Sequence, residues 1–377
     1  MGVSTAASSK VRDHEVPNGF PALLEGFRTK LDGELKAWLE SRRRLAMETG
    51  SPEMLELVDG VGQLVVNGGK RLRPALVYYA YQACGGRSDD EVLPLALSTE
   101  LLHTYLLIHD DIMDHAEVRR GQPAAHVRFR NAHRTRGFHG DAQDFGHSVA
   151  ILLGDLAHTW AVELASRAGA TGSGHSEVAR CFAAMSEEVI GGQYLELLVA
   201  QRRSASEAEL TRVLRLKSGC YTAERPVQLG ALLAGADPAV IAELSRYGSA
   251  VGEAFQLQDD LLGMFGNADT VGKPVGDDLR EGKFTFLIHH AFAGATSATP
   301  EQREALEAAL GNPGVTAGEV ARVQAILQET GARAEVERMI DERLETARRA
   351  LEGLDGLRSE GRLFLQGLVE YLREREQ

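Results

Sequence analysis

Helical periodicity extends through almost the whole chain and limits the folds open to it more than any other feature. Apolar residues recur three and four positions apart over residues 93–111, 187–201 and 334–354, the spacing that puts them on one face of an α-helix. Runs that alternate strictly between apolar and polar residues, as half-buried strands do, are scarce. The pattern predicts an all-α protein.

Turn-rich segments divide this helical pattern without separating it into domains. Clusters of Gly and polar residues interrupt it at four places, residues 83–91, 168–176, 265–283 and 311–319. None of them has the low complexity of a long flexible linker. We therefore expect a flexible N-terminal tail over residues 1–20 and a single domain over residues 21–377.

Residues 120–148 form a longer polar segment, rich in Arg, His and Gly. This composition predicts a loop, and a loop of such length is usually either functional or disordered. The sequence favours neither interpretation over the other.

Composition and charge exclude several classes of protein. The formal net charge of −13 argues against nucleic acid as a partner. The three cysteines, Cys84, Cys181 and Cys220, include no CxxC pair and indicate reduced thiols. The N-terminus lacks the apolar core of a signal peptide, and no stretch approaches the ~18 uninterrupted apolar residues of a membrane span. These features predict a cytoplasmic protein without a membrane span.

One apolar stretch ends in a cluster of acidic residues, LLIHDDIMDHAEVRRGQP at residues 106–123. If the helix extends to this point, Asp110 and Asp114 share a face one turn apart, with Asp111 beside them. Carboxylates this close repel one another, so the arrangement calls for a positive partner. Mg²⁺ suits it, because this ion takes one or two carboxylates and completes its shell with water and phosphate oxygens. A solvated acidic helix end is the alternative for this motif alone.

A second stretch of the same design follows in the C-terminal half of the chain. FQLQDDLLGMFG at residues 255–266 delivers Asp259 and Asp260, and GKPVGDDLREGK follows at residues 272–283. Two acidic pairs, each followed by basic residues, indicate two helices that face each other across one cavity. Metal ions would lie between them.

Basic residues gather in two further segments. NGGKRLRPAL at residues 67–76 places Lys70, Arg71 and Arg73 around the start of a helix, and RLKSGCYTAERP contains Lys217. A helix N-terminus preceded by Gly and basic residues binds anions well, although a solvated basic turn is the plainer interpretation of the first segment alone. The acidic and basic segments together predict a site for two phosphorylated groups. The sequence contains no P-loop and no evident Ser-His-Asp or Cys-His constellation, which argues against those enzymes.

Taken in order, these motifs resemble those of the trans-isoprenyl diphosphate synthases, or polyprenyl synthetases. The resemblance spans about residues 60–290 through GGKRLRP, DDIMD, RRGQP, GGQYLEL, KSGCYT, FQLQDD and GKPVGDDLREGK, and is nearest to the short-chain geranylgeranyl and farnesyl type. It implies the isoprenoid synthase fold, a single-domain bundle of mostly antiparallel helices around a central cavity, usually as a homodimer. It also implies a Mg²⁺-dependent prenyltransferase that condenses isopentenyl diphosphate head-to-tail with an allylic diphosphate.

The resemblance also assigns roles to residues by their positions in the motifs. The metal ligands, for about three Mg²⁺ ions per active site, would be Asp110, Asp114, Asp259, Asp260 and Asp278. The allylic diphosphate and its reacting end would contact Arg119, Lys217, Ser218, Gln256 and Lys273. Isopentenyl diphosphate would be bound by Lys70, Arg73, His103 and Arg120, with Arg71 close by. The residues expected to act directly in catalysis are Asp110, Asp111, Asp114, Arg119, Lys217, Asp259 and Asp260.

Two positions depart from the pattern of the family. Gly263 stands where the second motif often has its last Asp, and Glu196 stands where Asp is common in the GQxxD element. We expect activity in spite of both, with the third metal ion depending more on Asp259.

Product length is expected to depend on the residues one helical turn before the first aspartate. By resemblance, Tyr105 and Leu106 form part of the cavity floor, about 6–8 Å below Asp110 along the helix. A bulky Tyr105 without a second aromatic beside it favours geranylgeranyl diphosphate as the product, with farnesyl diphosphate as the alternative. In the plainer interpretation Tyr105 is core packing and other residues set the depth.

Three other functions compete with this one. A terpene cyclase shares DDxxD but usually has an Asn/Ser/Glu metal motif, which is not evident here, and it has no need of GGKRLRP. A His-Asp phosphohydrolase, suggested by residues 109–111, needs separated histidine ligands that are not evident either. A catalytically silent subunit of a prenyl synthase is favoured only by Gly263.

Overall fold

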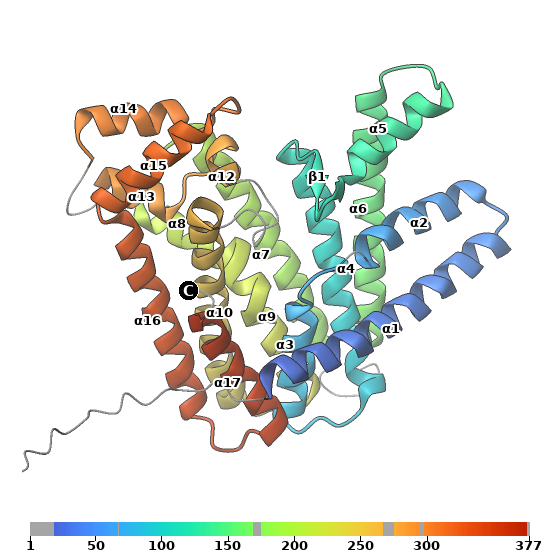
Figure 1. Ribbon diagram of the computed structural model, residues 1–377. Helices are drawn as coiled ribbons and strands as arrows, with labels where there is room; N and C mark the ends of the chain where they lie inside the picture. Colours follow the sequence, from blue (N-terminus) through green and yellow to red (C-terminus); the bar gives the residue numbers. More distant parts are fainter. Residues whose placement is uncertain (1–18, 67, 169–174, 267–274, 294–297, 375–377) are drawn as a thin grey trace, which may run out of the picture.

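The computed structural model describes residues 19–66, 68–168, 175–266, 275–293 and 298–374 (Figure 1). Almost all of the regular structure is helical, which confirms the predicted class; the strands among the described residues are β1 (Val118–Arg119) and β2 (Gln122–Pro123), an antiparallel pair. Most of the expected N-terminal tail lies outside the described residues. Its last residue, Phe20, is instead buried as the first residue of a helix.

The helices follow one another along the chain with short connections (Figure 1). In the N-terminal half they are α1 (Phe20–Glu48), α2 (Pro52–Val66), α3 (Leu72–Ala83), α4 (Asp89–Met113), α5 (Ala125–Arg136), α6 (Ala142–Arg167) and α7 (His175–Arg202). In the C-terminal half they are α8 (Glu207–Val213), η1 (Leu214–Glu224), α9 (Arg225–Leu233), α10 (Pro238–Phe265), α12 (Asp277–Arg280), α13 (Phe286–Ala293), α14 (Pro300–Ala309), α15 (Ala317–Glu329), α16 (Ala332–Glu352) and α17 (Ser359–Glu374).

The helices that carry the two aspartate motifs, α4 and α10, lie inside the bundle. α4 packs along α6 and α3, and α10 packs along α16 and η1. Leu97, Leu101 and Ile108 of α4 are buried, as their helical spacing predicts. The helix expected to end in the first motif does so, since Asp114 is the C-cap residue of α4. The fold therefore holds the acidic end of α4 on a rigid, buried helix.

By length and composition alone, α4 and α6 are each apolar enough to cross a membrane. In the fold they pack along each other, and 67% and 44% of their most apolar windows are buried inside the protein. A helix in the middle of a protein passes the same test because it is apolar on most of its surface. The absence of a membrane span stays a prediction.

The prediction of a loop over residues 120–148 is wrong for most of its length. These residues form the hairpin turn, α5 and the start of α6, and α5 packs along α6. The buried side of α5 includes Val127 and Phe129 but also His126 and His133. Because histidines occupy positions where a sequence pattern expects aliphatic residues, the polar composition concealed a helix.

A π-helix, η1, packs against both α7 and α10 and carries Lys217. Glycines in both neighbours allow its backbone to come close. A Cβ atom at Gly192 of α7 would lie 2.5 Å from the backbone N of Lys217, and one at Gly252 of α10 would lie 2.5 Å from the carbonyl O of Gly219. A side chain at either position would overlap the η1 backbone. π-helical turns are rare and often occur at functional sites.

Candidate active site

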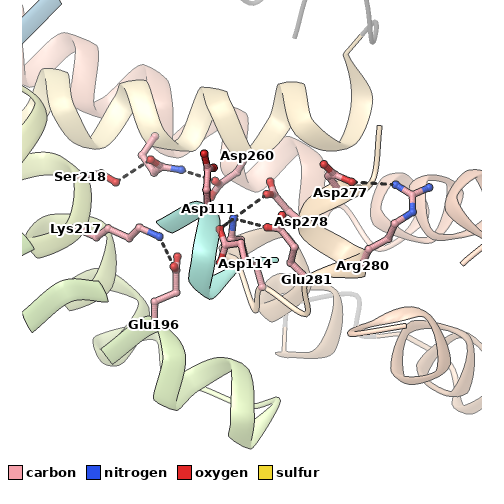
Figure 2. Close-up of polar contacts among 12 residues, drawn as sticks. Asp111, Asp114, Glu196, Lys217, Ser218, Asp260, Asp277, Asp278, Arg280 and Glu281 are labelled. Carbon is pink, nitrogen blue, oxygen red and sulfur yellow. Dashed lines mark hydrogen bonds and ion pairs between the residues drawn. The ribbon is translucent and has the colours of Figure 1, made fainter. Parts of the chain in front are cut away.

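The first aspartate motif and the acidic segment that follows the second motif meet at one lysine. Lys283 Nζ lies 3.7 Å from Oδ2 of Asp114, at the end of α4, and 3.3 Å from Oδ1 of Asp278, in α12. Figure 2 shows these two carboxylates close together although they are far apart in the sequence. Sequence reasoning gave Lys283 no role, yet its ammonium group links Asp114 of the first motif to Asp278.

A cavity of about 360 Å³, within the range of small-molecule sites, brings the motif residues together. Its lining includes Asp110 of α4, Asp259 of α10 and Lys217 of η1. Arg73 and His103, from the basic segment and from α4, line the same space. The prediction that two acidic helices face one cavity is therefore confirmed.

A smaller pocket of about 90 Å³ adjoins this cavity, and Lys217, Ser218 and Gln256 line both. Ser218 Oγ donates a hydrogen bond to Gln256 Oε1 over 2.8 Å, and Gln256 Nε2 donates one to Asp260 Oδ1 over 2.8 Å. Asp278 also lines the smaller pocket. Three of the predicted site residues, Ser218, Gln256 and Asp260, are thus connected by hydrogen bonds beside the main cavity.

Negative charge accumulates between the two motifs. Burial raises the pKa of Asp260 to about 8, and the nearby Asp278 adds to the effect. Burial likewise raises the pKa of Asp110, with Asp114 and Glu196 adding to it. Raised carboxyl pKa values mean that the charged form of these carboxyl groups is unfavourable here. A bound cation would stabilise the charged form.

The donor set suits a hard divalent ion that keeps part of its shell for water and substrate. In the described part of the chain, no three His, Cys, Asp or Glu side chains form a complete metal site built from protein alone. Mg²⁺ does not require one, because it is usually bound through one or two carboxylates together with substrate phosphates. Asp110 and Asp259 at the cavity would hold such ions, with Asp114, Asp260 and Asp278 nearby.

Lys217 is positioned by Glu196 of α7, with which its Nζ forms an ion pair (Figure 2). Burial by itself lowers the pKa of Lys217, but Glu196 and then Asp110 outweigh it, so the pKa is raised. The lysine therefore stays protonated at the cavity wall. Glu196, one of the two departures from the family pattern, has a defined partner.

Arg73 and His103 form the basic side of the cavity. Arg73 lies over the ring of Tyr221, 4.2 Å from its centroid, and donates a hydrogen bond to Thr222 Oγ1 over 3.0 Å. Nδ1 of His103 lies 2.7 Å from the hydroxyl of Tyr221. Burial lowers the pKa of His103 well below its ordinary value, with Arg73 the next largest cause. A neutral histidine beside an arginine leaves a cationic surface suited to an anion.

Arg119 and Arg120, at the β1–β2 hairpin, both contact protein groups. Arg119 Nε donates a hydrogen bond to Asp111 Oδ1 over 2.7 Å, and Arg120 donates one to the carbonyl O of Gly68. Asp111 is buried, so in this structure it holds Arg119. The catalytic and substrate-binding roles of these three residues stay predictions.

Arg71, which we expected close to isopentenyl diphosphate, is engaged by protein groups in the structure. Its side chain is 1% exposed, and three of its nitrogens donate to protein groups. The acceptors are Asp32 over 3.0 Å, Glu100 over 2.5 Å and the carbonyl O of Val65 over 2.7 Å. A guanidinium engaged in this way ties α3 to its neighbours instead of binding isopentenyl diphosphate.

Besides Lys217, two lysines, Lys70 and Lys273, were predicted to bind a diphosphate. Lys70 is exposed, with its Nζ 5.8 Å from the ring centroid of Phe255, a residue that lines the cavity. Lys273 lies outside the described residues.

Gly263 leaves room for Asp278. A Cβ atom at Gly263 would lie 2.9 Å from Oδ2 of Asp278, and the backbone N of Gly276 donates to the carbonyl O of Gly263 over 2.9 Å. The Asp278 carboxylate thus occupies the space that an aspartate at position 263 would need. The second motif lacks its last Asp at position 263, and Asp278 of the following segment supplies an acidic group in that place.

The apolar part of the cavity comes from α4 and α7. Tyr105 and Leu106 line it, in agreement with their expected place in the floor. Sequence reasoning missed the wall that α7 contributes, which consists of Val189, Ile190, Gln193, Tyr194 and Leu197. The helical spacing of these residues around GGQYLEL was the available signal.

Comparison with known proteins agrees with this geometry. A family model described as polyprenyl synthetase matches residues 56–328. Geranylfarnesyl diphosphate synthase of Aeropyrum pernix is 33% identical over 316 residues, covering 83% of this chain and 92% of that protein. Geranylgeranyl diphosphate synthase of Mycobacterium tuberculosis is 33% identical over 308 residues, covering 80% of this chain and 79% of that protein.

Solved structures show the same likeness across the fold. The crystal structure of geranylgeranyl pyrophosphate synthase from Corynebacterium glutamicum, complexed with isoprenyl diphosphate and magnesium, matches with a TM-score of 0.85 at 33% identity. The match covers 95% of this chain and 99% of that one.

Proposed function

The chain belongs to the polyprenyl synthetase family and is a prenyltransferase that makes short-chain prenyl diphosphates, and we propose that its product is geranylgeranyl diphosphate and that it requires Mg²⁺. The similar protein from Mycobacterium tuberculosis is named geranylgeranyl diphosphate synthase. The similar structure from Corynebacterium glutamicum is of a geranylgeranyl pyrophosphate synthase, complexed with isoprenyl diphosphate and magnesium.

One observation carries the proposal: acidic, basic and apolar side chains line a single cavity in separate parts. Asp110 and Asp259 supply carboxylates, Arg73 supplies a cation, and Tyr105 with Leu106 supplies an apolar floor. An allylic diphosphate has the matching chemistry, since a charged head is joined to an apolar tail. Because Arg73 adds a positive charge to the same cavity as the acidic groups, the cavity can bind a second diphosphate.

Bound Mg²⁺ would neutralise the diphosphate and stabilise the charge that develops as it leaves. Protonated Lys217 binds the same leaving group. As the C–O bond breaks, an allylic carbocation forms, and Gln256 with Ser218 presents polar groups beside it. The apolar wall keeps water away from this cation, which water would otherwise trap as an alcohol.

Arg73 and Arg120 would orient isopentenyl diphosphate so that its double bond attacks the cation. A new C–C bond forms, and the proton lost from the adjacent carbon passes to the released diphosphate. No side-chain nucleophile takes part. The protein contributes position, charge and exclusion of water.

Geranylgeranyl diphosphate is proposed as the product because Tyr105, the residue that the resemblance assigns to the cavity floor, lines the cavity. Farnesyl diphosphate is the alternative if the floor stops the chain one unit earlier. The number of metal ions, about three, is proposed from the resemblance of the two motifs.

We also propose that the protein acts as a homodimer. α6 exposes Ile151, Leu152 and Val162, and apolar residues on one exposed helix are typical of a contact surface. Sedimentation of the purified protein would measure its mass in solution.

The test is incubation of purified protein with isopentenyl diphosphate and dimethylallyl, geranyl or farnesyl diphosphate, with Mg²⁺ or with EDTA. Chromatography of the products should give geranylgeranyl diphosphate only with Mg²⁺. Asp259→Asn serves as the inactive control. If folded protein elongates no primer, the enzyme proposal fails and the silent-subunit alternative takes its place.

A further inference from the structure

Tyr221 of η1 contacts both groups that form the basic side of the cavity. Its ring lies under the guanidinium of Arg73, with Cζ of the arginine 4.2 Å from the ring centroid. Its hydroxyl O lies 2.7 Å from Nδ1 of His103 on α4. Tyr221 lines the cavity but is only 5% exposed. Neither the sequence motifs nor the mechanism above gave this residue a role.

The π-helical segment η1 brings Tyr221 to this position. Lys217 and Ser218 line the cavity from one turn of η1, and Tyr221 and Thr222 line it from the next. Arg73 contacts both residues of the second turn, because it lies over the Tyr221 ring and donates to Thr222 Oγ1 over 3.0 Å. The segment that carries Lys217 for one diphosphate therefore also positions the arginine expected to bind the other.

The hydrogen bond between Tyr221 and His103 has a definite direction. Burial raises the pKa of Tyr221, so the phenol keeps its proton, and within the described residues its hydroxyl has no other hydrogen-bond partner. A buried hydroxyl with one partner donates to it, because its hydrogen would otherwise lack an acceptor. Burial lowers the pKa of His103 well below its ordinary value, so the ring is neutral and Nδ1 accepts. The one proton of the imidazole then lies on Nε2.

We propose that Tyr221 is a positioning residue for isopentenyl diphosphate, because its hydroxyl holds His103 with the Nε2 proton available to the cavity. The inference rests on the proposed function. His103 lines the cavity, and in the described part of the chain Tyr221 is the one hydrogen-bond partner of its ring. A neutral histidine offers an anion a single N–H, and the partner of the other nitrogen determines which nitrogen carries it. Tyr221 acts through His103 and takes no part in bond formation.

Tyr221→Phe isolates this role, because the ring under Arg73 stays and only the hydroxyl is lost. Nothing then fixes the tautomer or the orientation of the His103 ring. We expect KM for isopentenyl diphosphate to rise about tenfold, the effect of losing one hydrogen bond to a charged group. Because Lys217 and the acidic residues are untouched, kcat and KM for dimethylallyl diphosphate should stay close to wild type. Steady-state kinetics in Mg²⁺ would measure all three constants.

A double-mutant cycle tests whether Tyr221 acts through His103. His103→Leu alone should raise KM for isopentenyl diphosphate at least as much as Tyr221→Phe does. In the His103→Leu background, Tyr221→Phe should cause little further change, since the hydroxyl then has no imidazole to orient. A further rise of about tenfold in that background would overturn the proposal, because the hydroxyl would then act independently of the histidine.

Tyr247→Phe is the matched control. It removes a buried tyrosine hydroxyl that donates to the carbonyl O of Leu365, at a residue that does not line the cavity. Both KM values should stay unchanged in this variant, and a rise like that in Tyr221→Phe would overturn the assignment. Elongation by the wild type with an unchanged KM for isopentenyl diphosphate in Tyr221→Phe would refute this inference alone. Absence of elongation by the folded wild type would refute the proposed function, and this inference with it.

Discussion

Replacement of Lys283 by Met tests whether this lysine neutralises the carboxylates of Asp114, Asp278 and Glu281 in the absence of metal. Its Nζ lies 2.6 Å from Glu281, 3.3 Å from Asp278 and 3.7 Å from Asp114, and its side chain is 19% exposed. Although burial opposes it, Asp278 and then Asp114 raise the pKa of Lys283 well above its ordinary value. The substitution would leave three carboxylates facing one another without a cation.

Removal of one partner from a buried ion pair costs about 3–5 kcal/mol. Because the acidic partners here are 14–25% exposed, the lower end applies, about 3 kcal/mol. For a chain of this size we expect the midpoint of thermal unfolding to fall by about 4 °C in EDTA. Mg²⁺ should then stabilise Lys283→Met more than the wild type, since the ion supplies the missing positive charge.

Differential scanning fluorimetry in EDTA and across a Mg²⁺ titration would measure both effects. Lys36→Met, at an exposed position of α1, is the matched control and should change stability by less than about 0.5 kcal/mol. Equal unfolding midpoints for wild type and Lys283→Met in EDTA, or equal stabilisation of the two by Mg²⁺, would show that the reasoning about this cluster is wrong.

Asp110→Asn should lower kcat by about 10²–10³-fold, which steady-state kinetics would measure. The metal-free variant should be at least as stable as wild type, because burial already disfavours the Asp110 charge. Melting curves in EDTA would check this, and a large loss of stability would contradict it. Gly263→Asp should not improve the enzyme: the new side chain competes with Asp278 for space, and we expect Mg²⁺ affinity to fall by about 10–100-fold, with tighter binding in a titration as the opposite result. Arg71→Met should cost about 3–5 kcal/mol of stability through its buried partner Glu100 and leave KM for isopentenyl diphosphate unchanged, whereas a raised KM with normal stability would restore the substrate-binding role.

The parts of the site that the sequence predicted are those that depend on helical spacing. The 3.6-residue period places Asp110 at the end of one buried helix and Asp259 near the end of another, and both line the cavity. Because the apolar faces of these helices are buried in the core, the carboxylates on the remaining face point toward the cavity. Tyr105, which the resemblance placed in the cavity floor, lines the same cavity.

The parts that the sequence did not predict depend on side-chain direction and on partners remote in the chain. Arg71 and Arg73 stand two residues apart, yet Arg71 turns toward Glu100 and away from the cavity that Arg73 lines. Nothing local distinguishes the two guanidinium groups. Similarly, α5 looked like a loop because it buries His126 and His133, residue types that are usually assigned to the surface.

The glycine contacts that hold η1 between α7 and α10 have a consequence for how this enzyme could diverge. Because backbone contacts at Gly192 and Gly252 determine where η1 lies, the backbone of Lys217 is held independently of the side chains that line the rest of the cavity. Substitutions that change the shape of the apolar part of the cavity therefore leave the diphosphate-binding residues in place. A lineage could change the shape of its apolar cavity by small steps in α4 and α7 without having to rebuild the chemistry each time.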